Sequence, residues 1–198
     1  MVEISEECWR MEGSRMFIKE GTEVSISELL KGMVIQSGND ASCALAEKIA
    51  GSQAAFADLM NDYAEQLDLK DTNFVNPTGL PDINHYSTAN DIAKLSIRLI
   101  DDFPNNYALF KEKEYTYNNI RQLNRNSLLW QDDSIDGIKT GHTNDSGYCL
   151  VASAERDEIR LIAVTLNSSS EKTRLQDSRR LLDYVFRFFK TKKILSKF

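Results

Sequence analysis

The sequence lacks several features by which particular classes of protein are identified. Of its 198 residues only three are proline, three are cysteine and two are histidine, and the net charge is -6. This negative charge excludes a nucleic-acid surface, which needs clustered cations to neutralise phosphates. No apolar run is long enough to span a bilayer. Four glutamates within the first twelve residues also exclude the apolar core of a signal peptide there.

The remaining composition is that of an ordinary globular domain. Hydrophobic residues make up 41% and charged residues 27% of the chain, so one domain with its own core is expected. The cysteines Cys8, Cys43 and Cys149 are odd in number and contain no C-x-x-C pair, so no disulfide framework is predicted. Cys43 falls in an alanine-rich helical run and Cys149 in a strand-like run. We therefore expect both to be small buried hydrophobes.

The first half of the chain shows helical periodicity. Ser25 and Glu28 form a capping-box pattern, and apolar residues at helical spacing follow it up to Ser37. Further helices are predicted over 41–50, capped by Asp40 and ended by Gly51, from residue 52 to about 67, and from residue 88 to the proline at 104. A loop rich in turn residues occupies 69–86. Residues 15–18 are compatible with a short strand.

The second half changes to strand patterns. Residues 114–118 alternate, and short apolar runs at 135–140, 147–154 and 159–166 predict antiparallel strands. A final helix over about 172–190 would bury Leu175, Leu182, Val185, Phe186 and Phe189. The order predicts an α+β domain over 1–198, with a mainly helical part at 23–105 and the sheet with the C-terminal helix at 106–198. Near the C-terminus, Lys190, Lys192, Lys193 and Lys197 form either a solvated helix end or a basic tail near a membrane.

Two tripeptides point to a chemistry. Ser37-Gly38-Asn39 lies between two predicted helices, and Lys139-Thr140-Gly141 lies on a predicted strand. Each also has a purely structural interpretation. Hydroxyl and amide side chains commonly end one helix and begin the next, and the second tripeptide is also compatible with an ordinary strand end and turn.

The order of these motifs resembles that of the serine penicillin-binding proteins, specifically the low-molecular-mass D-alanyl-D-alanine carboxypeptidases, which carry S-x-x-K, S-x-N and K-T-G along the chain. The resemblance extends over 30–33, 36–41, 74–80, 85–89, 107–113, 124–126 and 136–143. It implies a β-lactamase/transpeptidase-like fold, with a helical subdomain beside an antiparallel sheet. It further implies peptidoglycan stem peptides ending in D-Ala-D-Ala as substrates, β-lactams as ligands, a periplasmic or cell-envelope location, and neither cofactor nor metal.

Roles for seven residues follow from the resemblance. Ser37 would relay a proton to the departing D-alanine nitrogen, Asn39 would hold the acyl side of the peptide, and Lys139 would supply a positive field. Four residues would bind the substrate. Thr140 and Arg174 would bind its terminal carboxylate. Gly141 would let its backbone lie along the strand edge, and His142 would shape the cleft. Two alternatives stay open: a plain loop histidine at 142 and a solvated first-turn arginine at 174. Arg125 is interpreted as structural.

One departure from the family pattern bears on activity. The 36 residues before Ser37 contain no S-x-x-K, and the match Ser169-Ser170-Glu171-Lys172 follows K-T-G and is interpreted as chance. The resemblance thus implies a chain cut at both ends, without the nucleophile helix, the C-terminal sheet domain or a membrane anchor. Such a chain is expected to be inactive alone, with an apolar cavity beside its helices and weak stability or a tendency to oligomerise.

Two other functions are considered. A non-catalytic module that binds peptidoglycan peptides, or a structural module, would fit the absence of S-x-x-K. A β-lactamase fits less well, because that class usually has S-D-N where this chain has Gly38, and because the central loop offers Pro81-Asp82 rather than a glutamate that could activate water.

Overall fold

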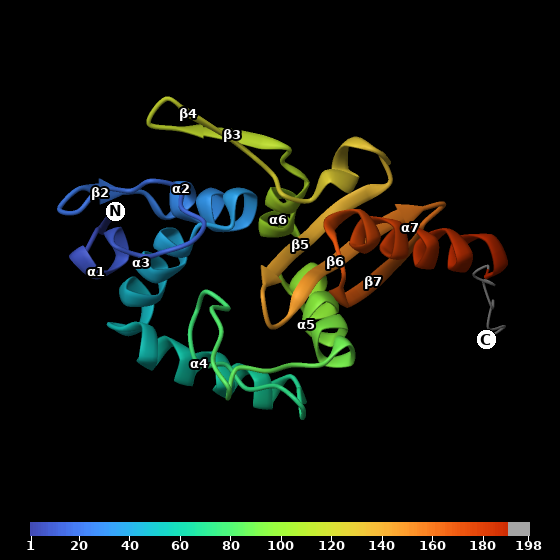
Figure 1. Ribbon diagram of the computed structural model, residues 1–198, viewed down its shortest axis with the longest axis horizontal. Coiled ribbons are helices and arrows are strands. Elements are labelled where there is room, and N and C mark those ends of the chain that lie inside the picture. Colours follow the sequence, from blue (N-terminus) through green and yellow to red (C-terminus); the bar gives the residue numbers. More distant parts are fainter. Residues whose placement is uncertain (190–198) are drawn as a thin grey trace, which may run out of the picture.

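The computed structural model describes residues 1–189, and the predicted lysine cluster at 190, 192, 193 and 197 lies outside this range. Helices dominate the first half of the chain, and a three-stranded antiparallel sheet covered by the last helix forms the second half (Figure 1). The predicted α+β class is therefore confirmed.

The N-terminal segment folds without the predicted strand at 15–18. Strand β1 (Val2–Glu3) pairs antiparallel with β2 (Glu23–Val24), and the short helix α1 (Glu6–Trp9) lies between them in sequence. Met16 and Ile18 are buried, while Phe17 between them has a φ of 69° and is partly exposed. The strand prediction was wrong because the backbone N–H groups of these three residues bind the side chain of Asp40 instead of a neighbouring strand.

The helical block follows the predicted capping signals. Ser25 and Glu28 form the expected capping box at α2 (Ile26–Lys31), which continues into the π-helical turn η1 (Gly32–Gln36). Helix α3 (Asn39–Ala50) begins one residue before the predicted cap, so Asp40 lies in its first turn rather than capping it. Gly51 ends α3 with a φ of 82°, a conformation that favours glycine. Helix α4 (Gln53–Gln66) begins after Ser52 as predicted, and the Ser52 side chain caps it.

A loop and a third long helix lead to the sheet. The predicted loop is tied by the isolated bridge between Asn73 and Tyr86. Thr88 caps α5 (Ala89–Asp102) through the backbone N–H of Asp91, as predicted. Pro104 stands just beyond the end of α5 and is the first residue of α6 (Pro104–Tyr107), which runs into the 3-10 turn η2 (Ala108–Lys111).

The sheet half contains one hairpin and one three-stranded sheet. The hairpin pairs β3 (Glu114–Tyr117) with β4 (Ile120–Leu123), and the 3-10 turn η3 (Ser127–Trp130) follows it. Strands β5 (Ile135–Thr143), β6 (Gly147–Arg156) and β7 (Ile159–Ser168) are antiparallel in the order β5-β6-β7, which leaves β5 at an edge among the described residues. Helix α7 (Glu171–Phe188) packs on β6 and β7.

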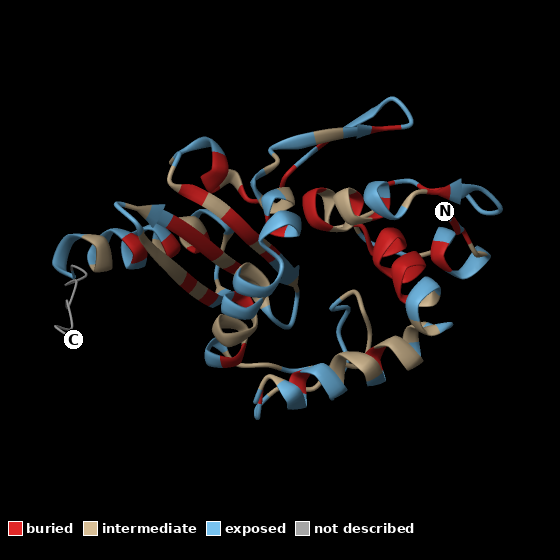
Figure 2. Cartoon of the chain, turned by 180° about the vertical axis from the view of Figure 1, so that it is seen from behind, coloured by how far each residue is buried: buried red, intermediate tan, exposed pale blue. Residues whose placement is uncertain are grey.

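Two hydrophobic cores stabilise the fold, and Tyr117 of β3 belongs to the first of them (Figure 2). One is built by the N-terminal segment with α2 and α3, and includes Met16 and Leu29. The other lies between the sheet and α7, and includes Leu150 and Leu182. Leu175 and Phe186 pack against the second core as predicted, whereas Phe189 follows the helix and is exposed.

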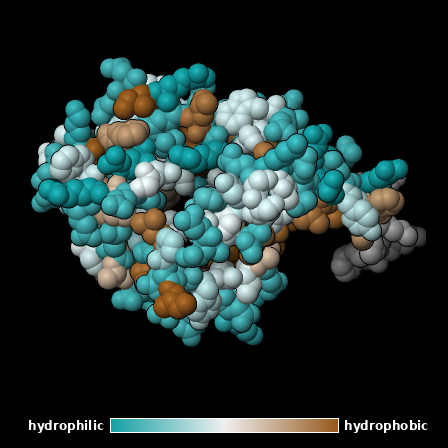
Figure 3. All heavy atoms as spheres, in the orientation of Figure 1, coloured by the Kyte–Doolittle hydropathy of each residue, from teal (hydrophilic) through white to brown (hydrophobic). Residues whose placement is uncertain are grey.

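The surface is mainly hydrophilic on the face shown in Figure 3, with hydrophobic residues scattered over it. None of the described helices combines the length and apolar character needed to cross a membrane.

Beside α4 lies an apolar cavity of about 350 Å³ whose lining includes Phe56, Leu59 and Leu95. An apolar cavity along the helical block was predicted.

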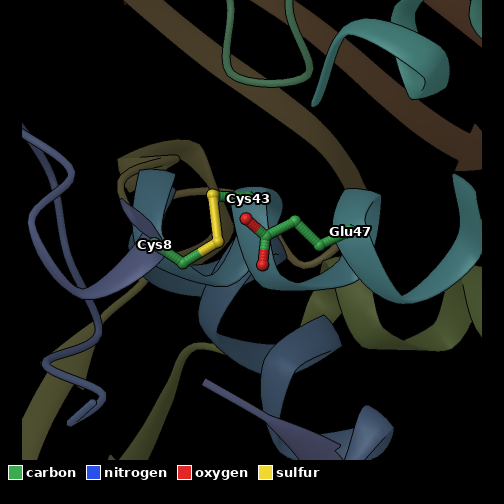
Figure 4. Close-up of side chains that lie close together, drawn as sticks. All are labelled: Cys8, Cys43 and Glu47. Carbon is green, nitrogen blue, oxygen red and sulfur yellow. A yellow bond between two sulfur atoms is a disulfide. The ribbon is translucent and has the colours of Figure 1, made fainter. Parts of the chain in front are cut away.

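The predicted burial of Cys43 is confirmed, but the expectation that the cysteines form no disulfide was wrong. These two residues form a disulfide between α1 and α3, and both are fully buried (Figure 4). Glu47 lies close to both sulfur atoms and accepts a hydrogen bond from the Ser5 hydroxyl at 3.1 Å. A metal would need free thiolates here, which the disulfide does not offer. Cys149 is only half-buried, so it was also wrongly expected to be buried.

Candidate active site

Ser37 occupies a constrained backbone position between two helical elements. The π-helical turn η1 ends at Ser37, whose φ of 63° and ψ of 40° lie in the left-handed region. A serine in this region carries steric strain, which surrounding contacts must hold in place. Its backbone N–H donates to the carbonyl oxygen of Gly32. The turn therefore presents the Ser37 hydroxyl at the junction between η1 and α3.

Asn39 is held by the N-terminal segment. Its backbone N–H donates to the Ser14 carbonyl at 2.7 Å, and its side-chain amide donates to the Glu12 carbonyl, also at 2.7 Å. A Cβ placed on Gly13 would lie 2.9 Å from the Asn39 amide nitrogen, so this glycine makes room for the side chain. The amide group has two N–H donors, and one of them is left for a ligand.

Asp40 fastens the same segment to α3. Its carboxylate accepts hydrogen bonds from the backbone N–H groups of Met16 and Phe17, each at 2.9 Å, and of Ile18 at 3.3 Å. The side chain is 1% exposed. Because a carboxylate binds N–H donors more strongly than a neutral acceptor does, Asp40 ties the N-terminal segment firmly to the start of α3, next to the S-x-N motif. Sequence reasoning missed this role, since a helix cap explained the residue equally well.

Lys139 lies on the edge strand β5 and joins the two motifs. Its ammonium donates to the Ser37 hydroxyl at 2.7 Å and to the Thr140 carbonyl at 2.8 Å. Burial, followed by the charges of Arg125 and Arg174, lowers the pKa of Lys139 to about 8. The lysine is thus cationic at neutral pH and close to its point of deprotonation, as expected in a site built for charge and proton movement.

Two arginines complete a cationic wall. Arg125 donates from Nε to the Gln36 carbonyl at 3.0 Å. Arg174 is 2% exposed, and its Nη2 donates to Glu171 at 3.2 Å while Nη1 reaches the Cys149 carbonyl at 3.5 Å. Its Nε has no partner among the residues that the structure describes. The alternative of a solvated Arg174 was therefore wrong.

All seven predicted site residues line one cavity of about 500 Å³: Ser37, Asn39, Lys139, Thr140, Gly141, His142 and Arg174. Gly141 adds no side chain there, and a Cβ placed on it would meet only Cys149, at 3.8 Å. His142 lies within β5 rather than in a loop, and the centroid of its ring lies 4.0 Å from that of Tyr148.

The cavity has further walls that sequence reasoning did not assign. They include Arg125, which the sequence analysis interpreted as structural, and the loop segment Pro77, Thr78, Gly79 and Leu80. The loop lies within one of the resembling segments, but its residue types indicate only a turn. Its place opposite β5 follows from tertiary structure, which no local pattern in the chain encodes.

A family model described as D-alanyl-D-alanine carboxypeptidase matches residues 1–170. The chain belongs to this family. Among curated relatives, it is 50% identical over 179 residues to the D-alanyl-D-alanine carboxypeptidase DacA of Escherichia coli (strain K12), a match that covers 90% of this chain and 44% of the relative. It is 48% identical to DacC of the same strain, covering 96% of this chain and 50% of the relative. The chain thus spans about half the length of the curated relatives it matches.

Solved structures of penicillin binding proteins share the fold. Penicillin binding protein 6B from Escherichia coli superposes with a TM-score of 0.93 at 43% identity, covering 99% of this chain and 64% of that one. Penicillin binding protein 5 from Haemophilus influenzae gives a TM-score of 0.92 at 44% identity, with coverages of 94% and 56%. The penicillin-binding-protein fold predicted from the resemblance is therefore confirmed.

Proposed function

We propose that this chain forms the substrate-binding walls of a serine-type D-alanyl-D-alanine carboxypeptidase cleft. Its ligands are peptidoglycan stem peptides ending in D-Ala-D-Ala, and β-lactams that resemble them. The observation that carries the proposal is the 2.7 Å contact between the Lys139 ammonium and the Ser37 hydroxyl inside the cavity. Family membership supports it, because the curated relatives are named for this activity.

The peptide's terminal carboxylate is held at the cationic end of the cleft. Thr140 and Arg174 bind the carboxylate, since a guanidinium matches a planar anion and a hydroxyl donates to it. Lys139 adds a positive field in the same cavity. The peptide backbone lies along the free edge of β5 beside Gly141, as an added strand would, and His142 shapes the end of this edge.

The acyl side of the peptide is held at the helix junction. Asn39 donates its free amide N–H to the acyl group, and Ser37 relays a proton to the leaving amine nitrogen when the amide is cleaved. Cleavage also needs a nucleophilic serine with its lysine, and no S-x-x-K stands before Ser37 in these 198 residues. We therefore infer that this chain alone binds the peptide without acylation.

The cleft lies between two parts of one unit, for which we propose the boundaries 23–105 and 106–198. Ser37 and Asn39 come from the first part, and Lys139 and Arg174 from the second. The bacterial cell envelope or periplasm is the compartment in which this ligand occurs, and we propose that location for the function.

Two measurements test the proposal on the 198-residue chain. Incubation with a fluorescent penicillin should leave no label on the denatured protein, and a covalent adduct would overturn the inferred lack of acylation. Calorimetry with an N-acylated D-Ala-D-Ala peptide should show binding with a Kd of about 1 mM, and the L-Ala-L-Ala peptide should bind less well. Equal heats for the two peptides, or no heat at millimolar ligand, would contradict the proposed substrate.

A non-catalytic peptide-binding module is the second candidate function. It needs only the walls of the cleft, which this chain supplies from Ser37 to Arg174. It predicts the same D-Ala-D-Ala binding, but no carboxypeptidase activity in any longer protein that contains this chain. Assaying release of D-alanine by the protein as its gene encodes it would separate the two functions.

A further inference from the structure

Cys149 is the cysteine that neither the disulfide nor the proposed chemistry uses. All three cysteines lie within the described residues, and Cys8 and Cys43 are bonded to each other. Cys149 lies on β6 directly opposite Gly141 of the edge strand, and it lines the same cavity as the two motifs. Its thiol donates to the Ser146 carbonyl at 3.3 Å. A half-buried thiol at the wall of an open cavity is accessible to a small reagent.

The charges around this thiol determine which class of reagent reacts with it fastest. Three cations, Arg125, Lys139 and Arg174, line the cavity together with one carboxylate, that of Glu171. Glu171 is largely exposed and is already bound to Arg174. The excess of positive charge attracts anions into the cavity, where partial burial weakens screening by salt.

The guanidinium of Arg174 gives an independent indication of an anionic ligand at this position. Its side chain is 3% exposed, its Nη1 reaches the Cys149 backbone carbonyl at 3.5 Å, and its Nε has no partner among residues 1–189. A buried donor without a partner costs free energy that a bound acceptor recovers. An anionic group bound here would lie beside the residue that carries the thiol.

We propose that Cys149 is a thiolation site for small disulfides that carry a carboxylate. The Cys149 thiolate attacks one sulfur of the reagent, so that a Cys149–reagent disulfide forms, the reagent's own S–S bond breaks, and its other half leaves as a thiolate. The reagent is the oxidant, and the carboxylate is bound by Arg174 and the neighbouring cations. The group attached to Cys149 then occupies the space beside Gly141.

The rate of thiolation by reagents of different charge tests this proposal without reference to the proposed function. The unreduced chain is mixed with 5,5′-dithiobis(2-nitrobenzoate), which carries carboxylates, or with neutral 4,4′-dithiodipyridine, and each rate is divided by that of N-acetylcysteine. The anionic reagent should release one equivalent of thiolate and react roughly tenfold faster on this scale. The preference should shrink at about 1 M salt.

Variants assign the site and the charge effect. Cys149→Ser should abolish the release. Arg174→Gln should reduce the preference for the anionic reagent several-fold. If this variant does not fold, Arg125→Gln, at a less buried position, should have the same effect. Arg179→Gln is the matched control, because it removes an exposed arginine of the same helix outside the cavity. No release from the native chain, label mapped to Cys8 or Cys43, or equal normalised rates for the two reagents would overturn the proposal.

Discussion

The ammonium of Lys139 lies 2.7 Å from the hydroxyl of Ser37, although 102 positions separate the two residues in sequence. This contact joins the edge of the three-stranded sheet to the junction of two helical elements. One hydrophobic core lies in the N-terminal helical block and includes Tyr117 of β3, and the other lies between the three-stranded sheet and α7. The cleft is therefore formed where the two halves meet, and its chemistry depends on how each half fixes one partner of this pair.

Deprotonation of Lys139 should weaken binding of an anionic peptide above neutral pH. The pKa of Lys139 is lowered to about 8, below its ordinary value of 10.5, by burial and the two arginines. The lysine is thus charged below pH 8 and loses its charge as the pH rises through 8. Titration of the D-Ala-D-Ala peptide by calorimetry between pH 6.5 and 9.5 should show affinity falling several-fold, with a midpoint near the lysine pKa.

Substitution at the same position separates this effect from other titrations. Lys139→Met should bind the peptide weakly at every pH, with no step near 8. Lys139→Arg keeps its charge over the whole range and should lose the step as well. A step of unchanged size in either variant would show that another group is responsible.

Loss of the Asp40 charge should destabilise the fold. Asp40→Asn keeps one carbonyl oxygen but loses the charge and the second acceptor for the N–H groups of residues 16–18. Urea denaturation should show a loss of about 2–3 kcal/mol in the free energy of unfolding. Asp58→Asn, at an exposed position on α4, should change it by less than about 0.5 kcal/mol. Equal effects of the two substitutions would contradict the role given to Asp40.

Local signals predicted the regular elements, because capping acts over three or four residues. Ser25, Ser52 and Thr88 each accept the backbone N–H that their position implies. The strands of the sheet were likewise apparent as apolar runs. The family resemblance predicted one site from seven residues, and all seven line one cavity.

Contacts between distant segments could not be predicted in the same way. The Cys8–Cys43 disulfide spans 35 positions, and a count of three cysteines gives no pairing. Strand β1 is two residues long and pairs with β2 some twenty positions later, which leaves no periodic pattern. Arg125 follows the β3–β4 hairpin, and the path of the chain after this hairpin brings it to the cleft. The residues next to it in sequence contain no pattern that indicates this role.

The disulfide should contribute strongly to stability. A covalent link across 35 positions restricts the unfolded chain, and the loop-entropy relation gives roughly 3–4 kcal/mol for such a loop. Urea denaturation of Cys149→Ser with and without a phosphine reductant should show a loss of this order on reduction. A chain that also carries Cys8→Ser and Cys43→Ser should have the same low free energy of unfolding with and without the reductant. If reduction leaves the Cys149→Ser midpoint unchanged, the disulfide does not stabilise the fold.

Gly13 and Gly51 offer a matched pair that tests the support of Asn39. Both have a positive φ, 81° and 82°, so alanine at either position should cost about 1 kcal/mol of backbone strain. The Cβ of Gly51→Ala would meet nothing within 4 Å, whereas that of Gly13→Ala would lie 2.9 Å from the Asn39 amide nitrogen. Both variants should therefore melt at lower temperature, but only Gly13→Ala should displace Asn39 and weaken peptide binding several-fold. Calorimetry with the D-Ala-D-Ala peptide beside thermal melts of both variants checks this, and equal loss of affinity in the two would exclude a specific role for Asn39.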